Sequence, residues 1–330
     1  MKEIQTDLEN EYINKINTIL RPKNNSKYTV LDLFAGCGGT ALGFEAAGFN
    51  THGIEMNEDC CDTYSTNVNK ICKKEVLIID SEFPQADVVI GGPPCQPFSV
   101  RGKQKGLTDS RDGFPIFIKA IEKIRPKIWM FENVRGLLYR NKWYLDEILK
   151  KLESLEYIIE VKLLKVSDFG VPQNRERVIV VGHKGNFKWP KEITEKVTAG
   201  EALGSMVLDL PDNPKFLTKK MDEYIARYEA ASKCKVPRDL HLDRPARTLT
   251  CRNLAGSTSD MHRIKLPNGK RRRLTVREAA RLQSFPDWFE FKGNETSKFN
   301  QIGNAVPPLF SYYLAKEIFN YLENEENNDV

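Results

Sequence analysis

The chain alternates short apolar runs with stretches of helical periodicity, and this pattern limits the possible folds more than any other feature. Strand-like segments, most of them with an apolar run, occur at 28–34, 50–54, 76–80, 87–90, 127–131, 157–166 and 178–182. Amphipathic or helix-like segments lie around and between them, at 5–20, 40–47, 114–124 and 143–155. Strands that alternate with helices predict an α/β fold, with a mostly parallel sheet and helices on both faces.

A glycine-rich turn joins the first strand to the helix after it. Ala35-Gly36-Cys37-Gly38-Gly39 follows the strand directly, and glycines let a backbone approach a ligand where a Cβ atom would clash. The next strand ends in Glu55, at the spacing where nucleotide-binding folds place an acid on a ribose diol. These residues predict a site for a ribose-bearing cofactor, and NAD would satisfy this part of the pattern too.

A single cysteine lies in a frame of prolines after the strand at 87–90. The stretch is Gly91-Gly92-Pro93-Pro94-Cys95-Gln96-Pro97-Phe98-Ser99. Each proline fixes its own φ and biases the preceding residue away from helix, so Cys95 is held in a stiff, extended turn. Free cysteines are usually buried and structural, but a core cysteine needs no such frame. We therefore predict that Cys95 is a nucleophile.

Charged residues follow or precede two other strands. Glu132 comes directly after the run at 127–131, and carboxyl ends of parallel strands line one ligand-binding edge, so Glu132 and Cys95 are expected on one rim. Arg175 and Arg177 flank Glu176 just before the strand at 178–182. Such a trio could be an ordinary exposed salt bridge, which contributes little to stability.

The basic, glycine-bearing segment 100–113 is either a disordered surface loop or a lid over a phosphate backbone, and its place beside Cys95 favours the lid.

The alternating pattern stops near residue 184, where prolines and short apolar runs begin. We expect a larger domain at 1–183 and 296–330, and a smaller, irregular one at 184–295. Residues 183–281 hold 22 Lys and Arg against 12 Asp and Glu, a net charge of +10, whereas the rest of the chain carries −5. A basic segment on an acidic body suggests a polyanionic partner, although a charged run is usually only a solvated face.

The seven cysteines bear on metal binding and on the cellular compartment. Their odd number, without zinc-ligand spacing, indicates reduced thiols and no metal site. The polar N-terminus does not resemble a signal peptide, and no apolar run could span a bilayer. We expect a cytoplasmic protein, associated with the bacterial nucleoid if its partner is DNA.

Several of these stretches together resemble the motifs of the DNA cytosine-5 methyltransferases. The resemblance rests on Phe34-Ala-Gly-Cys-Gly-Gly, the Pro-Pro-Cys stretch, Glu132-Asn133-Val134, Gln-x-Arg-x-Arg at 173–177, Thr248-Leu249, the block 274–286 and Gln301-Ile-Gly-Asn-Ala-Val-Pro-Pro. They occur in the family's order between Leu31 and Pro308. The resemblance implies a Rossmann-like domain that binds S-adenosylmethionine, and a smaller target-recognition domain. It also implies methyl transfer to C5 of a cytosine flipped out of a specific double-stranded DNA sequence.

The resemblance also implies roles for individual residues. Cys95 would attack C6 of the cytosine, Glu132 would bind N3, Arg177 would hold the base, and Arg175 would support Glu132 or the strand ends. The cofactor would contact Phe34, Ala35, Gly36, Gly38, Gly39, Glu55, Met56, Asp80, Pro93, Asn304 and Ala305. The DNA would contact Gln96, Ser99, Arg101, Thr248, Leu249, Arg252 and Asn253.

Alternatives remain open at this point. A branch of the family acts on tRNA, and a catalytically silent DNA-binding regulator could keep the same fold. By analogy with the family, the chain is expected to be a monomer and the modification enzyme of a restriction–modification system, with a possible cognate endonuclease. The recognised DNA sequence cannot be read from the chain.

Overall fold

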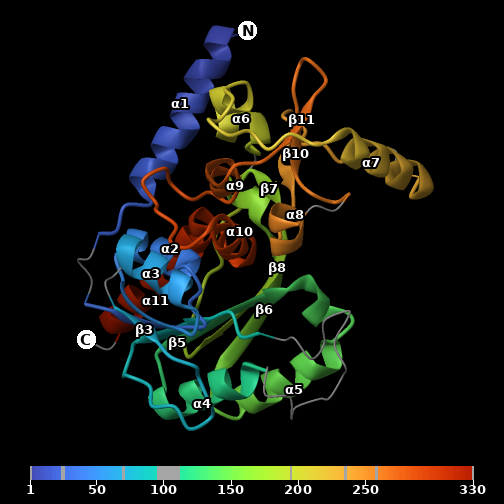
Figure 1. Ribbon diagram of the computed structural model, residues 1–330. Coiled ribbons are helices and arrows are strands. Elements are labelled where there is room, and N and C mark those ends of the chain that lie inside the picture. The colour runs from blue at the N-terminus through green and yellow to red at the C-terminus, as the bar shows by residue number, and fades with distance from the viewer. Residues whose placement is uncertain are drawn as a thin grey trace.

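A computed structural model describes residues 2–23, 27–68, 71–94, 112–193, 195–233, 236–256 and 259–328. Its centre is a seven-stranded sheet of order β3-β2-β1-β4-β5-β8-β6 (Figure 1). The strands are β1 (Thr29–Leu33), β2 (Asn50–Glu55), β3 (Cys72–Lys74), β4 (Val88–Gly91), β5 (Ile128–Val134), β6 (Ile158–Lys165) and β8 (Glu176–His183). β1 to β5 pair in parallel, and β8 runs antiparallel to both β5 and β6. The predicted α/β fold with a mostly parallel sheet is confirmed.

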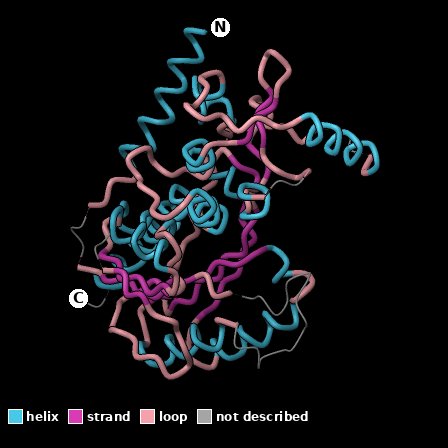
Figure 2. The backbone as a smooth tube through the Cα atoms, in the orientation of Figure 1, coloured by secondary structure: helices cyan, strands magenta, loops and turns pink. Residues whose placement is uncertain are grey.

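Helices cover both faces of the sheet (Figure 2). On one face, α4 (Phe114–Ile124) and α5 (Lys142–Glu153) pack on alternate strand residues such as Leu31 and Phe131. On the other, α2 (Gly39–Ala47) and α11 (Pro308–Asn328) pack on the residues between, such as Val30 and Met130. α3 (Glu58–Asn67) lies beside β2 and β3. Because successive strand side chains point to opposite faces, apolar runs such as 128–131 supply both cores.

The third strand differs from the one predicted. β3 is Cys72–Lys74, paired with Gly53–Glu55 of β2, whereas residues 76–80 form no strand. The apolar side chains of Val76, Ile78 and Ile79 are largely exposed. The chain leaves the sheet just after Glu75, whose N–H donates to Glu55 O at 2.9 Å. The prediction of a strand ending at Asp80 is therefore wrong, and Asp80 lies in an exposed turn.

The region after β8 has short helices and only two-stranded pairings. It contains α6 (Ala199–Leu203), α7 (Lys219–Ala231), α8 (Cys251–Ala255) and α9 (Val276–Leu282), with the hairpin β10 (Arg263–Lys265) and β11 (Arg271–Arg273). β7 (Gln173–Asn174) pairs with β9 (Ala246–Arg247) and so joins this region to the segment before β8. α10 (Glu295–Asn304) leads back to the sheet. Short 3-10 turns complete the chain: η3 (Arg135–Leu138), η4 (Val166–Phe169) and η5 (Gly204–Val207).

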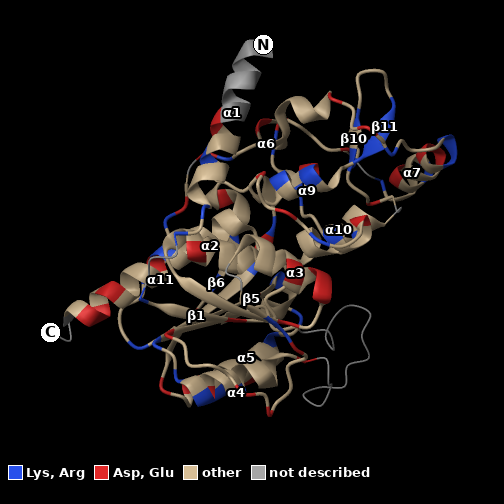
Figure 3. Ribbon diagram, turned by 60° about the vertical axis from the view of Figure 1, so that its left-hand side comes forward, with Lys and Arg blue, Asp and Glu red and all other residues tan. Residues whose placement is uncertain are grey.

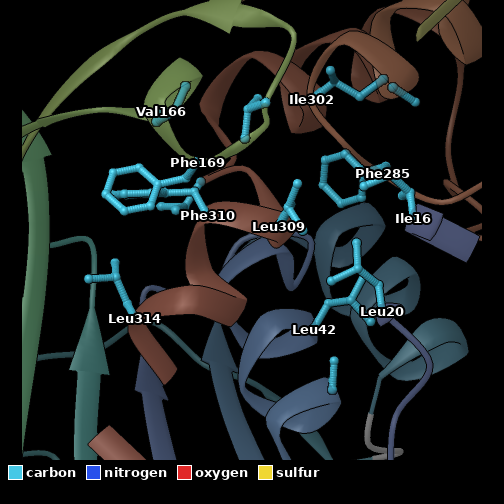
Figure 4. Packing of buried hydrophobic residues seen from close by; sticks show 14 of the residues in the cluster. Ile16, Leu20, Leu42, Val166, Phe169, Phe285, Ile302, Leu309, Phe310 and Leu314 are labelled. Atoms are coloured by element: carbon cyan, nitrogen blue, oxygen red, sulfur yellow. The ribbon is translucent and has the colours of Figure 1, made fainter. Parts of the chain in front are cut away.

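One apolar core continues from the sheet into this region. Ile16 and Leu20, in and just after α1 (Lys2–Ile19), belong to the same buried cluster as Phe285, Ile302 and Leu309 (Figure 4). Hydrogen bonds add to the apolar contact, because Asn17 Oδ1 accepts the Asp287 N–H at 2.7 Å and Asn17 O accepts the Trp288 indole N–H at 3.1 Å. The first helix therefore holds the region 184–295 against the sheet. The domain boundaries themselves stay a prediction.

Candidate active site

The sheet brings Glu132 and Arg177 together at one edge. The antiparallel register places Glu132 opposite Ile179 and Val134 opposite Arg177, so the two charged residues are diagonal neighbours. Arg177 Nε lies 2.5 Å from Glu132 Oε1, and the two side chains are only 12% and 14% exposed. A carboxylate and a guanidinium are therefore held as a largely buried ion pair at the end of β5.

The segment that leads to Cys95 begins beside this pair. Asn133 Nδ2 donates to Pro93 O at 3.0 Å, which ties the end of β5 to the residues after β4. A Cβ atom on Gly92 would lie 3.9 Å from Glu132 Oε2. Cys95, Gln96, Ser99 and Arg101 lie outside the described residues, as does most of the segment 100–113. The described chain resumes at the same place, because the Gly113 N–H donates to Pro94 O at 3.0 Å.

The glycine-rich turn has the backbone of a ligand-binding loop. Phe34, Gly36 and Gly38 have positive φ values of 60°, 55° and 87°. The Gly36 N–H donates to Glu55 Oε2 and the Asn57 N–H to Glu55 Oε1, both at 2.8 Å. No heavy atom lies within 4 Å of where a Cβ on Gly36 would be, so the turn faces open space there. A carboxylate has about four acceptor positions, so Glu55 keeps some for a ligand hydroxyl.

The end of α10 packs against this turn. A Cβ on Gly39 would lie 2.5 Å from Val306 O and 3.2 Å from Ala305 Cβ, so only glycine fits there. Asn304 is exposed and its Oδ1 accepts from Cys251 Sγ at 2.8 Å. The structure therefore brings Ala305 to the turn and Asn304 beside α8. Pro93 is buried, Met56 is exposed just beyond Glu55, and Asp80 lies in the exposed turn described above.

Arg175 is buried and joins the two regions of the chain. Its Nη1 donates to Leu249 O at 2.9 Å and to Gly303 O at 3.2 Å. Burial, aided by repulsion from Arg177, lowers the pKa of Arg175 to about 9. In this position Arg175 connects the start of β8 to the segment before α8 and to α10.

The residues predicted to contact DNA fall into two groups. Arg252 is exposed on α8, and Thr248 is half-buried, with its hydroxyl donating to Asn174 O at 2.6 Å. Leu249 and Asn253 are buried. Asn253 Nδ2 donates to Thr248 O at 2.9 Å and its Oδ1 accepts the Thr250 N–H at 2.8 Å, so both ends of the amide bond within the chain. Leu249 and Asn253 therefore shape this segment and leave its outer surface to Arg252 and Thr248.

Gln173 is a positioning residue to which sequence reasoning assigned no role. It is fully buried, its Oε1 accepts the Leu249 N–H at 2.8 Å, and its Nε2 donates to Gln283 Oε1. Gln283 Nε2 donates in turn to Ile302 O at 2.8 Å. The only sequence signal was the place of Gln173 at the head of the Gln-x-Arg-x-Arg stretch.

Three arginines of the basic range 183–281 are neutralised by ion pairs within the protein. We call this set of ion pairs the arginine network. Arg272 pairs with Glu278 at 2.7 Å, and both side chains are buried. The other pairs are Arg263 with Asp239 and Glu229, at 2.5 and 2.8 Å, and Arg271 with Asp222 and Asp239, at 3.0 and 3.2 Å. Figure 3 shows Lys and Arg residues in blue on β11 and α9, in the second region. Lys265 and Lys270, which do not belong to the network, are exposed.

Two further observations concern membranes and metals. Within the described ranges, no helix combines the length and the apolar character needed to cross a membrane. The same part of the chain contains no cluster of three or more His, Cys, Asp or Glu side chains suited to a metal ion.

The sheet order, the glycine-rich turn and the acid at the end of β2 define a Rossmann-like α/β protein with charged residues at the carboxyl edge of its sheet. Residues 28–320 match the family described as C-5 cytosine-specific DNA methylase. The chain belongs to this family, whose members use S-adenosylmethionine to methylate C5 of cytosine in DNA. The predicted family and enzyme class are confirmed: the chain is a DNA (cytosine-5) methyltransferase.

Named relatives and solved structures agree with this assignment. The chain is 56% identical over 303 residues to the type II methyltransferase M.AplI of Arthrospira platensis, an alignment that covers 91% of this chain and 88% of the relative. It is 34% identical to the type II methyltransferase M.FnuDI of Fusobacterium nucleatum, with 90% and 96% covered. The methyltransferase EhMeth of Entamoeba histolytica has the same fold, with a TM-score of 0.68 at 18% identity and coverage of 90% and 99%.

Proposed function

We propose that this chain transfers a methyl group from S-adenosylmethionine to C5 of a cytosine flipped out of double-stranded DNA, through a covalent bond between Cys95 and C6. The observation that carries the proposal is the buried Glu132–Arg177 pair at the end of β5, beside the start of the segment that leads to Cys95. A carboxylate and a guanidinium can bind the edge of a pyrimidine, and a thiolate three residues past Gly92 can attack its ring.

The residues of the glycine-rich turn fit S-adenosylmethionine. The open space beside Gly36 admits a ligand close to the backbone, and the Glu55 carboxylate, fixed by two backbone N–H groups, can accept from the ribose hydroxyls. Phe34, at the end of β1, would pack against the cofactor, and Ala305 would close the site from the α10 side. Bound there, S-adenosylmethionine supplies an electrophilic methyl group to C5.

The chain's own residues supply the activation of the cytosine. C5 is a poor nucleophile until the thiolate of Cys95 adds to C6, which places electron density on C5. Glu132, protonated or sharing a proton, would hydrogen-bond at N3 and Arg177 would hold the base, each kept in place by the other. After methylation, loss of the C5 proton to water allows the bond between Cys95 Sγ and C6 to break, which frees the thiol. A stacked base cannot reach Cys95, so the cytosine must leave the helix, at a cost of a few kcal/mol.

The biological setting follows from the relatives' names. M.AplI and M.FnuDI are type II methyltransferases, which supports a role as the modification enzyme of a restriction–modification system. In that setting the chain acts as a monomer in the bacterial cytoplasm, on the sequence that a cognate endonuclease would cut.

A mechanism-based trap tests the proposal. Duplex DNA with 5-fluorocytosine at the target base should form a covalent adduct with the wild-type chain in the presence of S-adenosylmethionine, seen as a shifted band on a denaturing gel. Cys95→Ser should form none, whereas Cys72→Ser, which removes a thiol on β3, should form it normally. Duplex DNA and tRNA are compared as substrates in the same assay. An adduct with Cys95→Ser, or methylation of tRNA alone, would overturn the proposal.

The role of Glu132 has a matched control. Glu132→Gln should lower kcat by about 10²–10⁴-fold, the usual contribution of a positioned acid–base group. Glu176→Gln removes the same charge from the residue before Arg177, on the neighbouring strand β8. The Glu176 carboxylate pairs with the exposed Arg135, so this variant should leave kcat nearly unchanged. Equal rates for the two variants would remove Glu132 from the mechanism.

A further inference from the structure

A short surface segment directly after Glu132 combines exposed aromatic rings with positive charge. We call residues 134–143 the aromatic–basic strip. Tyr139 is 61% exposed and Trp143 51% exposed, and the side chains of Arg135, Arg140 and Lys142 are exposed as well. The sequence of the strip, VRGLLYRNKW, contains no acidic residue. Large exposed aromatic side chains next to unopposed cations are typical of surfaces that bind nucleic acid.

The strip lies on the same rim as the active site. It runs from the last residue of β5 through η3 to the first turn of α5, two residues beyond Glu132 (Figure 1). Arg135 Nη1 pairs with Glu176 Oε2 at 2.7 Å, so the strip begins beside the residue that precedes Arg177. Asn174, two residues earlier, accepts the hydroxyl of Thr248. The strip therefore borders both the Glu132–Arg177 pair and the exposed part of the predicted recognition segment.

The backbone of the strip is anchored in the protein. Leu137 and Tyr144 are fully buried, and the Tyr144 ring packs edge-on against Phe114 at 5.7 Å between centroids. The Asn141 and Tyr139 N–H groups donate to Gly136 O at 3.2 and 3.3 Å. Fixed anchors on both sides hold the exposed rings and cations in a set arrangement, which lowers the entropy lost when a ligand binds.

The charges of the strip differ from those of the second region. Arg263 and Arg272 are buried in ion pairs, whereas Arg140 and Lys142 have no ion-pair partner among the described residues. An unpaired cation near the surface can neutralise a phosphate and release its counterions, while an arginine already paired inside the protein cannot. The strip therefore supplies positive charge without an ion-pair partner among the described residues, next to Glu132.

We propose that the aromatic–basic strip binds the DNA backbone beside the flipped cytosine. Arg140 and Lys142 contact phosphates, and the rings of Tyr139 and Trp143 lie against the adjoining sugars and bases. This inference rests on the proposed function only in that the substrate is DNA. It makes the strip a substrate-binding surface next to Glu132.

The first test uses the salt dependence of binding to a duplex that contains the target sequence. Arg140→Ala/Lys142→Ala should bind more weakly, and the slope of log affinity against log salt should fall by about 1.8 if both residues contact phosphates. Lys150→Ala/Lys151→Ala makes the same charge change in the last turn of α5 and is the control. Identical slopes for the two double variants would overturn the proposal. Affinity for S-adenosylmethionine, which a misfolded variant would lose, should be unchanged in both.

The second test locates the DNA at Trp143. Of the other tryptophans, Trp129 is fully buried and Trp189 and Trp288 are half-buried, so Trp143 is the one most open to solvent. Saturating duplex should protect part of the tryptophan emission from quenching by neutral acrylamide. In Trp143→Phe that protected fraction should be missing, although DNA is still bound.

The outcomes separate this proposal from the proposed function. A wild-type chain that binds duplex DNA and shows both effects, but forms no 5-fluorocytosine adduct, contradicts only the mechanism. A chain that methylates DNA with equal slopes, or with protection unchanged in Trp143→Phe, contradicts only the strip.

Discussion

The two regions of the molecule use different interactions in their interiors. The sheet region is filled by apolar side chains such as Phe131 and Met130, which alternate between its two faces, and its charged pair Glu132–Arg177 lies at the edge. The second region has short strands, and its interior includes the arginine network. Burying charge is costly unless each group is paired, so the network depends on every one of its partners.

This difference shows that positive charge in a sequence does not locate a binding surface. Residues 183–281 carry all of the chain's excess positive charge, yet Arg263 and Arg272 are buried in ion pairs. The strip after β5 has only three cations, but two of them have no ion-pair partner among the described residues.

The largest effect is expected from breaking a pair in the arginine network. Glu278→Gln keeps the shape of the side chain but leaves the Arg272 charge buried without compensation, which should lower the free energy of unfolding by about 3–5 kcal/mol. Glu176→Gln breaks the exposed pair with Arg135 and should cost about 0–1 kcal/mol. Urea denaturation measures both. Similar losses of unfolding free energy in the two variants would mean that buried and exposed ion pairs contribute equally to stability.

The next effect is a dependence of stability on pH that originates in the second region. Burial lowers the pKa of His262 from 6.5 to about 4. Between these values the unfolded chain binds a proton that the native protein does not, so His262 contributes stability above pH 6.5 that is lost as the pH falls toward 4. The loss should be about 1.4 kcal/mol per pH unit in this window. Urea denaturation between pH 4 and 7 should show a smaller slope for His262→Asn.

Asp32 in β1 should make the stability of the protein depend on pH in the direction opposite to that of His262. Burial, with a smaller contribution from the nearby Glu55 charge, raises the pKa of Asp32 well above 3.8, so the native protein keeps a proton that the unfolded chain releases. Its contribution is complete below the unfolded pKa and is lost as the pH rises. Asp32→Asn should therefore become relatively more stable with increasing pH. A wild-type pH profile that neither variant alters would contradict both assignments.

The smallest effect is expected where α10 returns to the glycine-rich turn. Gly39→Ala would place a Cβ atom 2.5 Å from Val306 O, and such overpacking should cost about 1–3 kcal/mol and weaken binding of S-adenosylmethionine. Gly136→Ala meets no atom within 4 Å and should leave both unchanged. Thermal unfolding with and without S-adenosylmethionine measures the two effects. If Gly39→Ala binds S-adenosylmethionine with unaltered affinity, the glycine-rich turn does not form part of the cofactor site.

The sequence predicted most of the sheet because strands such as β4, β5 and β8 contain continuous apolar runs. It misplaced β3 because Val76, Ile78 and Ile79 are apolar yet largely exposed, while Cys72–Lys74, with two lysines, pairs with the edge of β2. An edge strand needs little apolar surface, so its position depends on backbone pairing that the residue types do not report.

The site was predicted to the extent that it depends on motifs. The residue types marked Glu132 and Arg177, but their contact results from the antiparallel register of β5 and β8, which is set by pairing over the whole strand. As a polar residue, Asn253 was expected at the surface. Its burial follows instead from its capping bond with Thr250 and from the packing of α8, which the residue type does not report. Charge pairing over long sequence separations hid the arginine network in the same way.

The bond between Gly113 and Pro94 has a consequence for how such proteins can diverge. The described chain stops at Pro94 and resumes at Asp112, and there the Gly113 N–H meets Pro94 O and a Cβ on Gly113 would strike the Pro94 ring. An excursion closed at its base can change length or composition while the sheet beneath it stays the same, because lengthening a closed loop costs little entropy. Exchanging residues 95–111, which include the proposed nucleophile Cys95, for those of a relative should therefore leave the thermal midpoint of the protein almost unchanged.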